Sequence, residues 1–347
     1  MAHLTDRQRF DLICVGDTAT DIYIALDPER VRIRTEPQGQ WLMVPFGAKV
    51  PFERTLTVEA GGNAANVAVG CARLELRTAL ASYLGADQLG REMLSALHGE
   101  GVDTSLVRLD RKSPTNQHFV LWLGDERTIL VHHVDYDYQW PHLRPSEVPA
   151  WLYLSSVGTH AHGYEEQIAD WLEENPSVRL AFEPGTHQIE EGAAALGRLY
   201  RRASLLLCNR DEAATITGTG GDSEVDVLLS ALLDLGPRIV VVTDSVAGAY
   251  AAEGAERYHV PSYPDAEPIV DRTGAGDAFS ATLLAYLVRG LTLEEALARA
   301  PINAMSVVHA PGTQAGLLRD HQISSYLASA PSGYGVRVTH APLAGRS

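Results

Sequence analysis

The sequence predicts an α/β protein built around a mainly parallel β-sheet, and two features of the chain support this prediction. Between residues 151 and 244, apolar strand-like runs alternate with helix-like stretches, which is the pattern of consecutive βα units. Near the N-terminus, residues 11–17 (DLICVGD) form a short apolar run that ends in Gly-Asp, as expected for a buried strand with polar groups at its carboxyl end. Because α/β folds bind ligands at that end of the sheet, we expect the functional site there.

The remaining elements of the main body follow from local pattern. Residues 61–74 begin with a Gly pair and continue with small apolar residues, which predicts a loop that leads into a tightly packed helix. The other expected helices lie at 89–99, 164–174, 189–201 and 210–217, with a long Ala/Leu-rich helix from about residue 276. The expected strands lie at 78–85, 151–158, 178–184, 204–209, 238–244, 249–253 and 256–260.

Two stretches fall outside this regular alternation. Residues 22–60 combine several prolines with Ile, Val, Trp and Phe, which indicates strands and turns rather than helix. Residues 115–134 contain two β-rich runs joined by Gly-Asp-Glu-Arg, a pattern typical of a hairpin. We expect the two stretches to form a small sheet apart from the main body, with the aromatic residues of 132–140 packed on it or facing a ligand.

Composition and charge limit the functional classes. The chain has 347 residues with 45% hydrophobic and 21% charged residues, which is ordinary for an ordered globular protein. Its net charge of −16 opposes a phosphate backbone, so no nucleic acid partner is expected. Residues 1–10 are polar and no 18 apolar residues run together, so we expect neither a signal peptide nor a membrane span, and a cytoplasmic protein. Cys14, Cys71 and Cys208 lack metal or redox spacing and are expected to be reduced core thiols.

Residues 271–279 (DRTGAGDAF) carry the clearest chemical signal. Gly274, Ala275 and Gly276 allow a tight turn whose N–H groups converge on one point, and the following helix adds its positive dipole end, so the segment predicts an anion site. Asp277 would stand in the first helical turn, where a carboxylate could accept a proton from an attacking hydroxyl. The alternative is that Asp277 only stabilises the start of the helix.

A second segment, residues 61–66 (GGNAAN), has neither the GxGxxG spacing of a dinucleotide site nor the GK[ST] of a P-loop. Gly61 and Gly62 could allow a ligand to approach the backbone, and the Asn66 amide can both donate and accept, which suits a sugar hydroxyl. In the alternative interpretation, the glycines only allow close helix packing.

Together and in this order, the two segments resemble the signatures of the ribokinase/PfkB family of carbohydrate kinases, which match GGNAANVAVG and DRTGAGDAF, and the resemblance extends over about residues 11–320. It implies a ribokinase-like three-layer α/β/α domain over residues 1–330 with a small β-sheet lid from about 22–60 and 113–140, followed by a flexible tail at 331–347. It also implies transfer of the γ-phosphoryl group of ATP to a sugar hydroxyl, usually a primary alcohol. A nucleoside kinase of the same family and a catalytically silent sugar- or nucleotide-binding protein are the alternatives.

The resemblance also assigns roles to residues around the acceptor. Residues 16–21 (GDTATD) are similar to the family's first-strand turn, so Asp17 and Asp21 would hold substrate hydroxyls together with Gly61, Gly62 and Asn66. Asp277 would be the catalytic base, and the backbone of Gly274, Ala275 and Gly276 would stabilise the transferred charge.

Nucleotide and metal sites are implied in the same way. Asn209 and Glu212 match an N-x-x-E motif that places Mg²⁺, often through water, although Glu212 could instead support the first turn of a helix. Residues 243–248 (TDSVAG) are similar to the nucleotide loop T-x-G-x-x-G, but Ser245 replaces a Gly. The positions assigned to ATP are Thr243, Asp244, Ser245, Gly248 and Asn303, which lies close to Pro301 where the family often has Asn. Asp271 and Thr273 match positions that bind K⁺ in several relatives.

Two further expectations concern surfaces. A small sheet with free edges and an apolar face, to which Trp41, Phe46 and Phe52 contribute, predicts a homodimer through the lids, as in some relatives, and closure of the lid over the substrate. His160 and His162 could be a pair of metal ligands, but no third ligand follows at a suitable spacing, so the sequence favours polar residues at the edge of a cleft.

Overall fold

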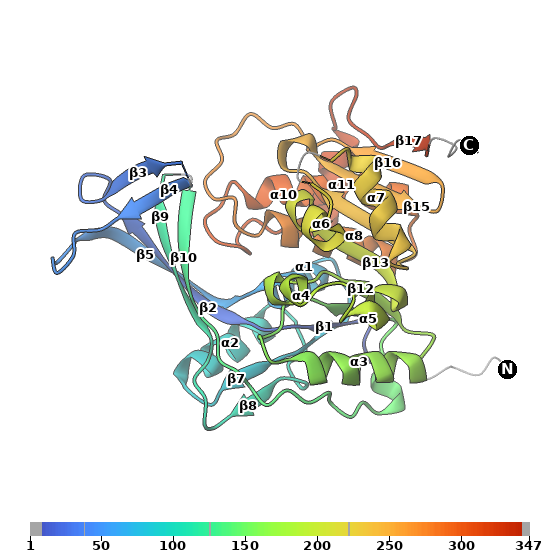
Figure 1. Cartoon of the computed structure of the whole chain (residues 1–347), viewed down its shortest axis with the longest axis horizontal. Helices are drawn as coiled ribbons and strands as arrows, with labels where there is room; N and C mark the ends of the chain where they lie inside the picture. The colour runs from blue at the N-terminus through green and yellow to red at the C-terminus, as the bar shows by residue number, and fades with distance from the viewer. Residues whose placement is uncertain (1–8, 38, 125, 221–222, 342–347) are drawn as a thin grey trace.

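The computed structural model describes residues 9–37, 39–124, 126–220 and 223–341 (Figure 1). Within these ranges the main body is a nine-stranded sheet of order β17-β16-β15-β14-β13-β12-β11-β1-β6. Its parallel part consists of β1 (Leu12–Val15), β6 (Thr78–Ala81), β11 (Trp151–Leu154), β12 (Arg179–Phe182), β13 (Ala203–Asn209) and β14 (Ile239–Thr243). An antiparallel edge follows with β15 (Ala249–Glu253), β16 (Glu256–Val260) and β17 (Arg337–His340).

Helices cover both faces of this sheet, which confirms the predicted three-layer architecture. The alternation of β1 shows the reason: Leu12 and Cys14 join one buried cluster, and Ile13 and Val15 join the other. The first cluster contains residues of α1 (Asn63–Arg73), α2 (Gln88–Gly99), α8 (Ala275–Val288), α9 (Leu293–Leu297), α10 (Ala300–Val307) and α11 (Asp320–Ala328). The second contains residues of α3 (His162–Glu174), α5 (Gly197–Arg202), α6 (Arg210–Thr217) and α7 (Val225–Asp234), with the short α4 (Thr186–Glu191) beside them.

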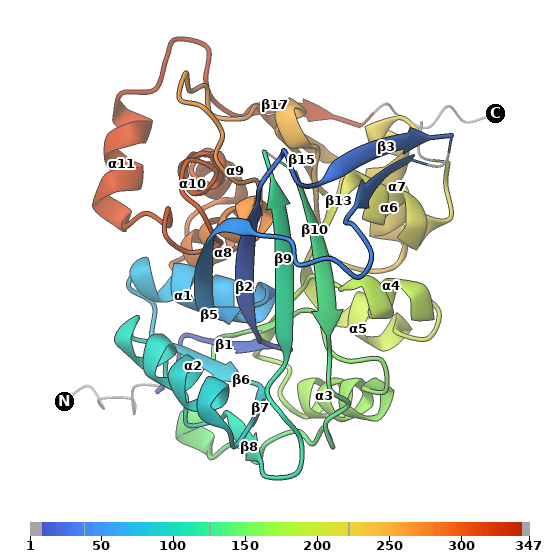
Figure 2. The same ribbon diagram turned by 90° about the vertical axis from the view of Figure 1, so that its left-hand side faces the viewer.

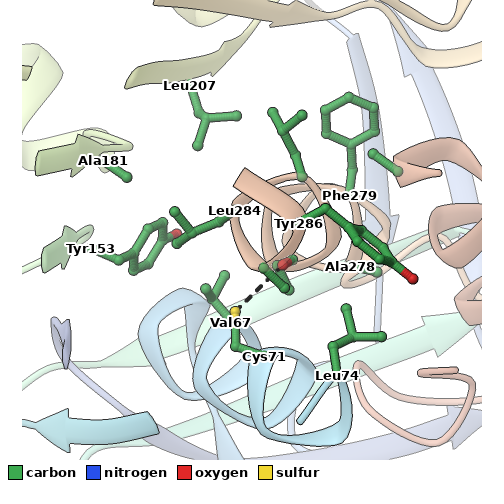
Figure 3. Close-up of a cluster of buried hydrophobic side chains, with 14 of the residues drawn as sticks. Val67, Cys71, Leu74, Tyr153, Ala181, Leu207, Ala278, Phe279, Leu284 and Tyr286 are labelled. Carbon is green, nitrogen blue, oxygen red and sulfur yellow. Dashed lines mark hydrogen bonds between the residues drawn. The ribbon is translucent and has the colours of Figure 1, made fainter. Parts of the chain in front are cut away.

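Helices α1 and α8, which carry the two signature segments, pack directly against each other (Figure 3). Gly70 of α1 faces Ala281 of α8 so closely that a Cβ on Gly70 would lie 2.6 Å from the Ala281 Cβ. The Cys71 thiol donates to the Ala281 carbonyl oxygen over 3.4 Å. The small residues of α1 therefore allow the two helices to approach, and this contact brings the starts of both helices together.

The small sheet forms beside the main body, as predicted, with strand order β10-β9-β2-β5 (Figure 2). Its strands are β2 (Ala19–Leu26), β5 (Phe52–Gly61), β9 (Gln117–Leu123) and β10 (Glu126–His132), and the hairpin of β3 (Arg32–Glu36) and β4 (Gly39–Met43) lies at its outer end. We call these strands the lid. Since β2 begins four residues after β1 ends, the lid is joined directly to β1, the strand next to the β6 edge of the main sheet.

Two predictions about loops and ends are wrong in part. In the aromatic segment 132–140, His133 stacks on His118 of lid strand β9, as predicted. Tyr136 and Tyr138 instead are buried in the main body, where they contact Tyr83 and, for Tyr138, Tyr164. The tail is not flexible throughout, because Arg337–His340 pairs with β16 as an edge strand. That pairing uses backbone hydrogen bonds and leaves exposed side chains, so it gives no apolar pattern in the sequence. Residues 342–347 of the predicted tail, and residues 1–8, lie outside the described ranges.

Smaller differences affect individual elements. The helix expected at 189–201 is interrupted at Gly192, which has a φ of +94°, and forms the separate helices α4 and α5. The sequence analysis did not predict α7, α9, α10, α11, the short strand β8 (Arg108–Asp110) that pairs with β7 (Tyr83–Gly85), or the 3-10 turns η1 (Pro145–Glu147) and η2 (Ser245–Ala247). The three cysteines are buried and free, as expected. None of the helices in the described ranges has the length and apolar character needed to cross a membrane.

Candidate active site

The predicted anion turn is formed at the start of α8. Gly274 is the residue before the helix and has a φ of +82°, which is a left-handed conformation that favours glycine. A Cβ at Gly274 would lie 2.8 Å from the Thr313 Cα, so the turn is also packed against a second loop. The free N–H groups of the first helical turn, which includes Ala275, Gly276 and Asp277, are the donors that an anion would meet here.

Asp277 is a half-buried carboxylate held in one orientation. Its Oδ2 accepts a hydrogen bond of 2.7 Å from the Asn66 amide nitrogen. Burial raises the pKa of Asp277 to about 6; the hydrogen bond from Asn66 opposes this rise, and the charges of Asp21 and Glu212 add to it. The group is therefore mostly ionised above pH 6 and can act as a proton acceptor near neutral pH.

Asn66 has a role that the sequence did not predict. Its side-chain oxygen accepts hydrogen bonds of 2.9 Å from the Thr313 hydroxyl and from the Gln314 amide, and its nitrogen donates to Asp277. The side chain is buried, and hydrogen bonds hold both its oxygen and its nitrogen. Asn66 therefore orients Asp277, the candidate base. Its contact with a substrate hydroxyl stays a prediction, and that contact would use the second hydrogen of the Asn66 amide.

Asp17 and Asp21 are both buried where β1 passes into the lid strand β2. Asp17 Oδ2 accepts a hydrogen bond of 2.7 Å from the Tyr138 hydroxyl, and Oδ1 has no hydrogen-bond partner within the described ranges. Burial raises the pKa of Asp17 to about 7, and the Tyr138 hydrogen bond opposes the rise. An unpartnered buried oxygen of this kind suits a substrate hydroxyl.

The Gly pair makes room for these carboxylates. A Cβ at Gly61 would overlap the Asp21 carboxylate, so only glycine allows the backbone of β5 to approach that side chain. Gly62 is the residue before α1, and its backbone lies against that of Asp17. We expected a ligand to approach the backbone at Gly61. In the structure, the side chain of Asp21 makes this close approach.

Two histidines extend this region: His118 of the lid strand β9, which was not predicted, and His133, which directly follows β10. The parallel register of β2 and β9 aligns Asp21 with His118, whose Nδ1 lies 2.9 Å from Asp21 Oδ1 without hydrogen-bond geometry. His118 Nε2 also lies 2.9 Å from His133 Nε2, and the two rings stack. Burial lowers the pKa of His133 to about 4, with the charge of His118 adding to the effect, so His133 is neutral at pH 7. Period-two alternation along the lid strands indicates which residues share a face, but the pairing of His118 with Asp21 depends on the register of β2 and β9.

Glu183 is the other residue that the sequence analysis missed. It follows β12 directly, at the carboxyl end of a parallel strand, and its Oε2 accepts a hydrogen bond of 2.8 Å from the Tyr153 hydroxyl. Burial raises its pKa to about 8, and the negative charges of Asp277 and Glu212 contribute. Its position after a buried strand was the available signal, because such positions face the ligand side of an α/β sheet.

Asn209 and Glu212 lie at the carboxyl end of β13, where they cap α6. Asn209 Oδ1 accepts from the Glu212 N–H over 2.9 Å, and Glu212 Oε2 accepts from the Asn209 N–H over 2.8 Å. Glu212 therefore does support the start of α6, as the alternative interpretation expected. This cap does not exclude a metal role, because Glu212 is coupled by charge to Asp277 and Glu183, and several carboxylates around one space suit Mg²⁺.

The predicted nucleotide loop is a tight turn between β14 and β15. Ser245, which replaces a glycine of the family pattern, has a φ of +45°, a left-handed backbone conformation that is uncommon without glycine. Asp244 forms an ion pair of 2.7 Å with Arg210, and the Asp244 N–H donates to the Gly248 carbonyl oxygen over 2.8 Å. Thr243 is the last residue of β14. The loop thus begins beside Asn209, because the β13–β14 register pairs Asn209 with Thr243.

The last two assignments differ in outcome. Asp271 is buried, its Oδ1 accepts from the Thr273 N–H and hydroxyl, and its Oδ2 accepts from the Gly312 N–H over 3.1 Å. These bonds hold the loop before α8, and the K⁺ site stays a prediction.

Asn303 does not face a nucleotide: it is fully buried, donates to the Thr282 hydroxyl and accepts from the Leu318 N–H. The assignment of Asn303 to ATP is therefore corrected to a structural role, because the helix turn that carries it faces the core.

Comparisons with known proteins agree with this geometry. The family model described as pfkB family carbohydrate kinase matches residues 40–320. The chain is 29% identical over 279 residues to a 5-dehydro-2-deoxygluconokinase of Bacillus velezensis, covering 74% of this chain and 82% of that protein. It is 28% identical to a nucleoside kinase of Methanothermobacter thermautotrophicus, covering 88% of this chain and 92% of that protein. The structure of an Arabidopsis thaliana ribokinase complexed with ribose and ATP superposes with a TM-score of 0.75 at 23% identity, covering 92% of this chain and 98% of that one.

The matched residues include most of the lid and the whole segment from Gly61 to Asp277, which carries both signature segments, while Asp17 and Asp21 precede the match. This protein is therefore a member of the pfkB family of carbohydrate kinases, which makes it a phosphotransferase with an alcohol group as acceptor.

Proposed function

We propose that this kinase transfers the γ-phosphoryl group of ATP to a hydroxyl, a primary alcohol, of a sugar. The observation that carries the proposal is the position of Asp277 in the first turn of α8, just after Gly274, where Asn66 holds its carboxylate. The pKa of Asp277 is raised to about 6. In this reaction Asp277 removes the proton of the acceptor hydroxyl, and the N–H groups at the start of α8 stabilise negative charge on the transferred group. The related Arabidopsis thaliana ribokinase with bound ribose and ATP supports ATP as donor.

Mg²⁺ is the second expected component, held near Asn209 and Glu212. Asn209 and Glu212 would hold the ion, often through water, and its positive charge would offset negative charge on the phosphates. The chain supplies an environment that suits it, since the negative charge of Glu212 raises the pKa of both Glu183 and Asp277, and that of Asp277 raises the pKa of Glu183. A divalent cation would remove that repulsion.

A sugar acceptor is favoured over a nucleoside by the position of the aromatic residues. Tyr136 and Tyr138, which could have stacked on a base, are 5% and 7% exposed and contact other tyrosines of the core. The acceptor side instead offers Asp17, Asp21 and the lid histidine His118, which are groups that hydrogen-bond hydroxyls.

A coupled assay of ATP consumption tests the proposal with a panel of neutral sugars, sugar acids and nucleosides in the presence of Mg²⁺. Turnover with a sugar is the expected result. Turnover with nucleosides alone would replace the sugar by the second candidate acceptor. Sugar binding by calorimetry without any ATP consumption would instead identify a catalytically silent binding protein.

Glu212→Gln is expected to raise the Mg²⁺ concentration needed for half-maximal activity, because a carboxylate that places the metal through water is lost. The substitution suits this structure, since a glutamine oxygen can still accept from the Asn209 N–H and preserve the cap. Activity is measured against Mg²⁺ concentration at saturating ATP. Asp211→Asn, on the exposed side of the same helical turn, is the matched control. Equal Mg²⁺ dependence of the wild type and Glu212→Gln would contradict the metal assignment.

The lids are proposed to join two copies of the chain. Asp21 faces the site, so its neighbour Ile22 faces outward, and the register places Phe119 and Leu130 beside Ile22 on the same face. Phe119 is 36% exposed and Leu130 52% exposed, and Trp41 of β4 and Phe46 in the loop after β4 are also exposed. Such an apolar sheet face is commonly covered by a partner.

Light scattering is therefore expected to give a mass near twice 37.6 kDa, and Leu130→Lys is expected to shift the protein toward the monomer. Val227→Lys on α7, where Val227 is 51% exposed, is the matched control and should not change the mass. A wild-type monomer at micromolar concentration with full activity would exclude the dimer and leave the kinase assignment intact.

A further inference from the structure

A second cluster of ligand-type side chains lies beside the acceptor region, on the helices that follow β11 and β12. His162 is the first residue of α3, Glu165 lies one turn further along the same helix, and Glu191 is the last residue of α4. One donor atom from each of the three lies within 4.8 Å of the others. His162 Nδ1 and Glu191 Oε1 are already 2.7 Å apart.

Glu165 is the unusual member of this cluster. It is only 2% exposed, and Gln188 donates to its Oε1 over 2.8 Å. Gln188 is itself buried and fixed, because its own oxygen accepts from the Gly185 N–H over 2.7 Å. Within the described ranges Glu165 Oε2 has no hydrogen-bond partner. This oxygen of a buried side chain is therefore available to a further ligand.

The free side of Glu165 faces a cavity of about 320 Å³. The cavity is lined by all three members of the cluster and by Gly158, Thr159, His187 and Gln188. There is therefore room beside the three donors for water or for a further ligand.

The geometry points to a divalent transition-metal site formed by His162, Glu165 and Glu191, of a kind suited to Zn²⁺, Co²⁺ or Mn²⁺. One imidazole nitrogen and two carboxylate oxygens are a donor set that such ions accept, and the cavity leaves open positions. Ligands about 2.1 Å from one ion are at most about 4.2 Å apart, so modest rotation of the exposed His162 and Glu191 side chains closes the set around an ion. Gln188 then has the function of an outer hydrogen-bond donor that orients the Glu165 carboxylate.

The sequence analysis did not identify this site because it considered His160 and His162 as the pair of metal ligands. His160 and His162 are two residues apart, but His160 contacts Asp135 and is not part of the cluster. The i, i+3 spacing of His162 and Glu165 places both on one helix face, and the third ligand comes from a different helix 26 residues later along the chain. The proposed site is separate from the Mg²⁺ position near Asn209 and Glu212, so it does not depend on the proposed function.

Equilibrium dialysis of the full, tag-free chain against Zn²⁺, with Mg²⁺ in excess to occupy the phosphoryl-transfer site, tests the inference. One Zn²⁺ per chain is expected. Glu165→Gln and His162→Gln should each weaken this binding by at least about tenfold. Co²⁺ should give visible absorption bands of a low-coordinate complex that both variants lose.

His160→Gln is the matched control, since His160 is an exposed neighbouring histidine outside the cluster, and it should bind Zn²⁺ like the wild type. Circular dichroism and melting temperature establish that the variants are folded, and His162→Gln changes only an exposed side chain if Glu165→Gln is unstable. Absence of stoichiometric Zn²⁺ and Co²⁺ binding, or binding that survives in His162→Gln but not in His160→Gln, would overturn the site.

Discussion

Asp277→Asn is expected to lower kcat by about 100-fold or more, the usual scale for removal of a general base, while ligand binding and the fold are kept. The asparagine side chain has the same shape, and its oxygen can still accept the hydrogen bond that Asn66 donates to Asp277. What is lost is the capacity to take the proton of the acceptor hydroxyl. Steady-state kinetics with the best sugar from the panel, together with calorimetric binding of that sugar, measure the two effects separately.

The pH dependence provides an independent check on the same residue. Burial raises the pKa of Asp277 to about 6, so the base is protonated and inactive below that pH and ionised above it. In the wild type kcat/KM should therefore rise as the pH increases through about 6 and level off above it. The residual activity of Asp277→Asn should lack this rise. Near-wild-type activity in a folded Asp277→Asn protein would rule out the catalytic role.

Gly274→Ala is expected to reduce kcat by about 100-fold and to destabilise the protein by about 1–3 kcal/mol. Two effects act together. An alanine at a φ of +82° is strained, and its Cβ would lie 2.8 Å from the Thr313 backbone, so the turn has to move. The N–H groups at the start of α8 would then no longer converge where the transferred charge develops, and Thr313 would also shift the Asn66 side chain to which it donates.

Gly276→Ala is the matched control for the stability part of this prediction. Gly276 is exposed, lies two residues further along the same motif, and has open space around an added Cβ. Its melting temperature should equal or exceed that of the wild type, because alanine is the better helix former. Equal melting temperatures and equal kcat for Gly274→Ala and the wild type would show that the turn at Gly274 is not needed for the site.

The main elements of the site were predictable because their sequence signals are local. A buried strand followed by Gly-Asp, the Gly pair before α1, and DRTGAGDAF before α8 each determine a backbone conformation within a few residues. The faces of the helices and the lid hairpin follow from apolar alternation of period two or 3.6 in the same way. For the same reason, β17 and the break at Gly192 were missed, since neither changes the apolar pattern.

By itself the sequence determined the α/β class, the two signature segments and hence the family, because these depend on short-range patterns and on residue types. Only the tertiary structure decided which side chains meet. Asn66 orients Asp277 across 211 positions of the chain, His118 reaches Asp21 through a strand register, and Tyr138 donates to Asp17 from a segment expected on the lid. Asn303 faces the core, and Glu165 meets Glu191 from another helix. Contacts of this kind arise from the packing of elements that are distant in sequence, and no local pattern of residues encodes them.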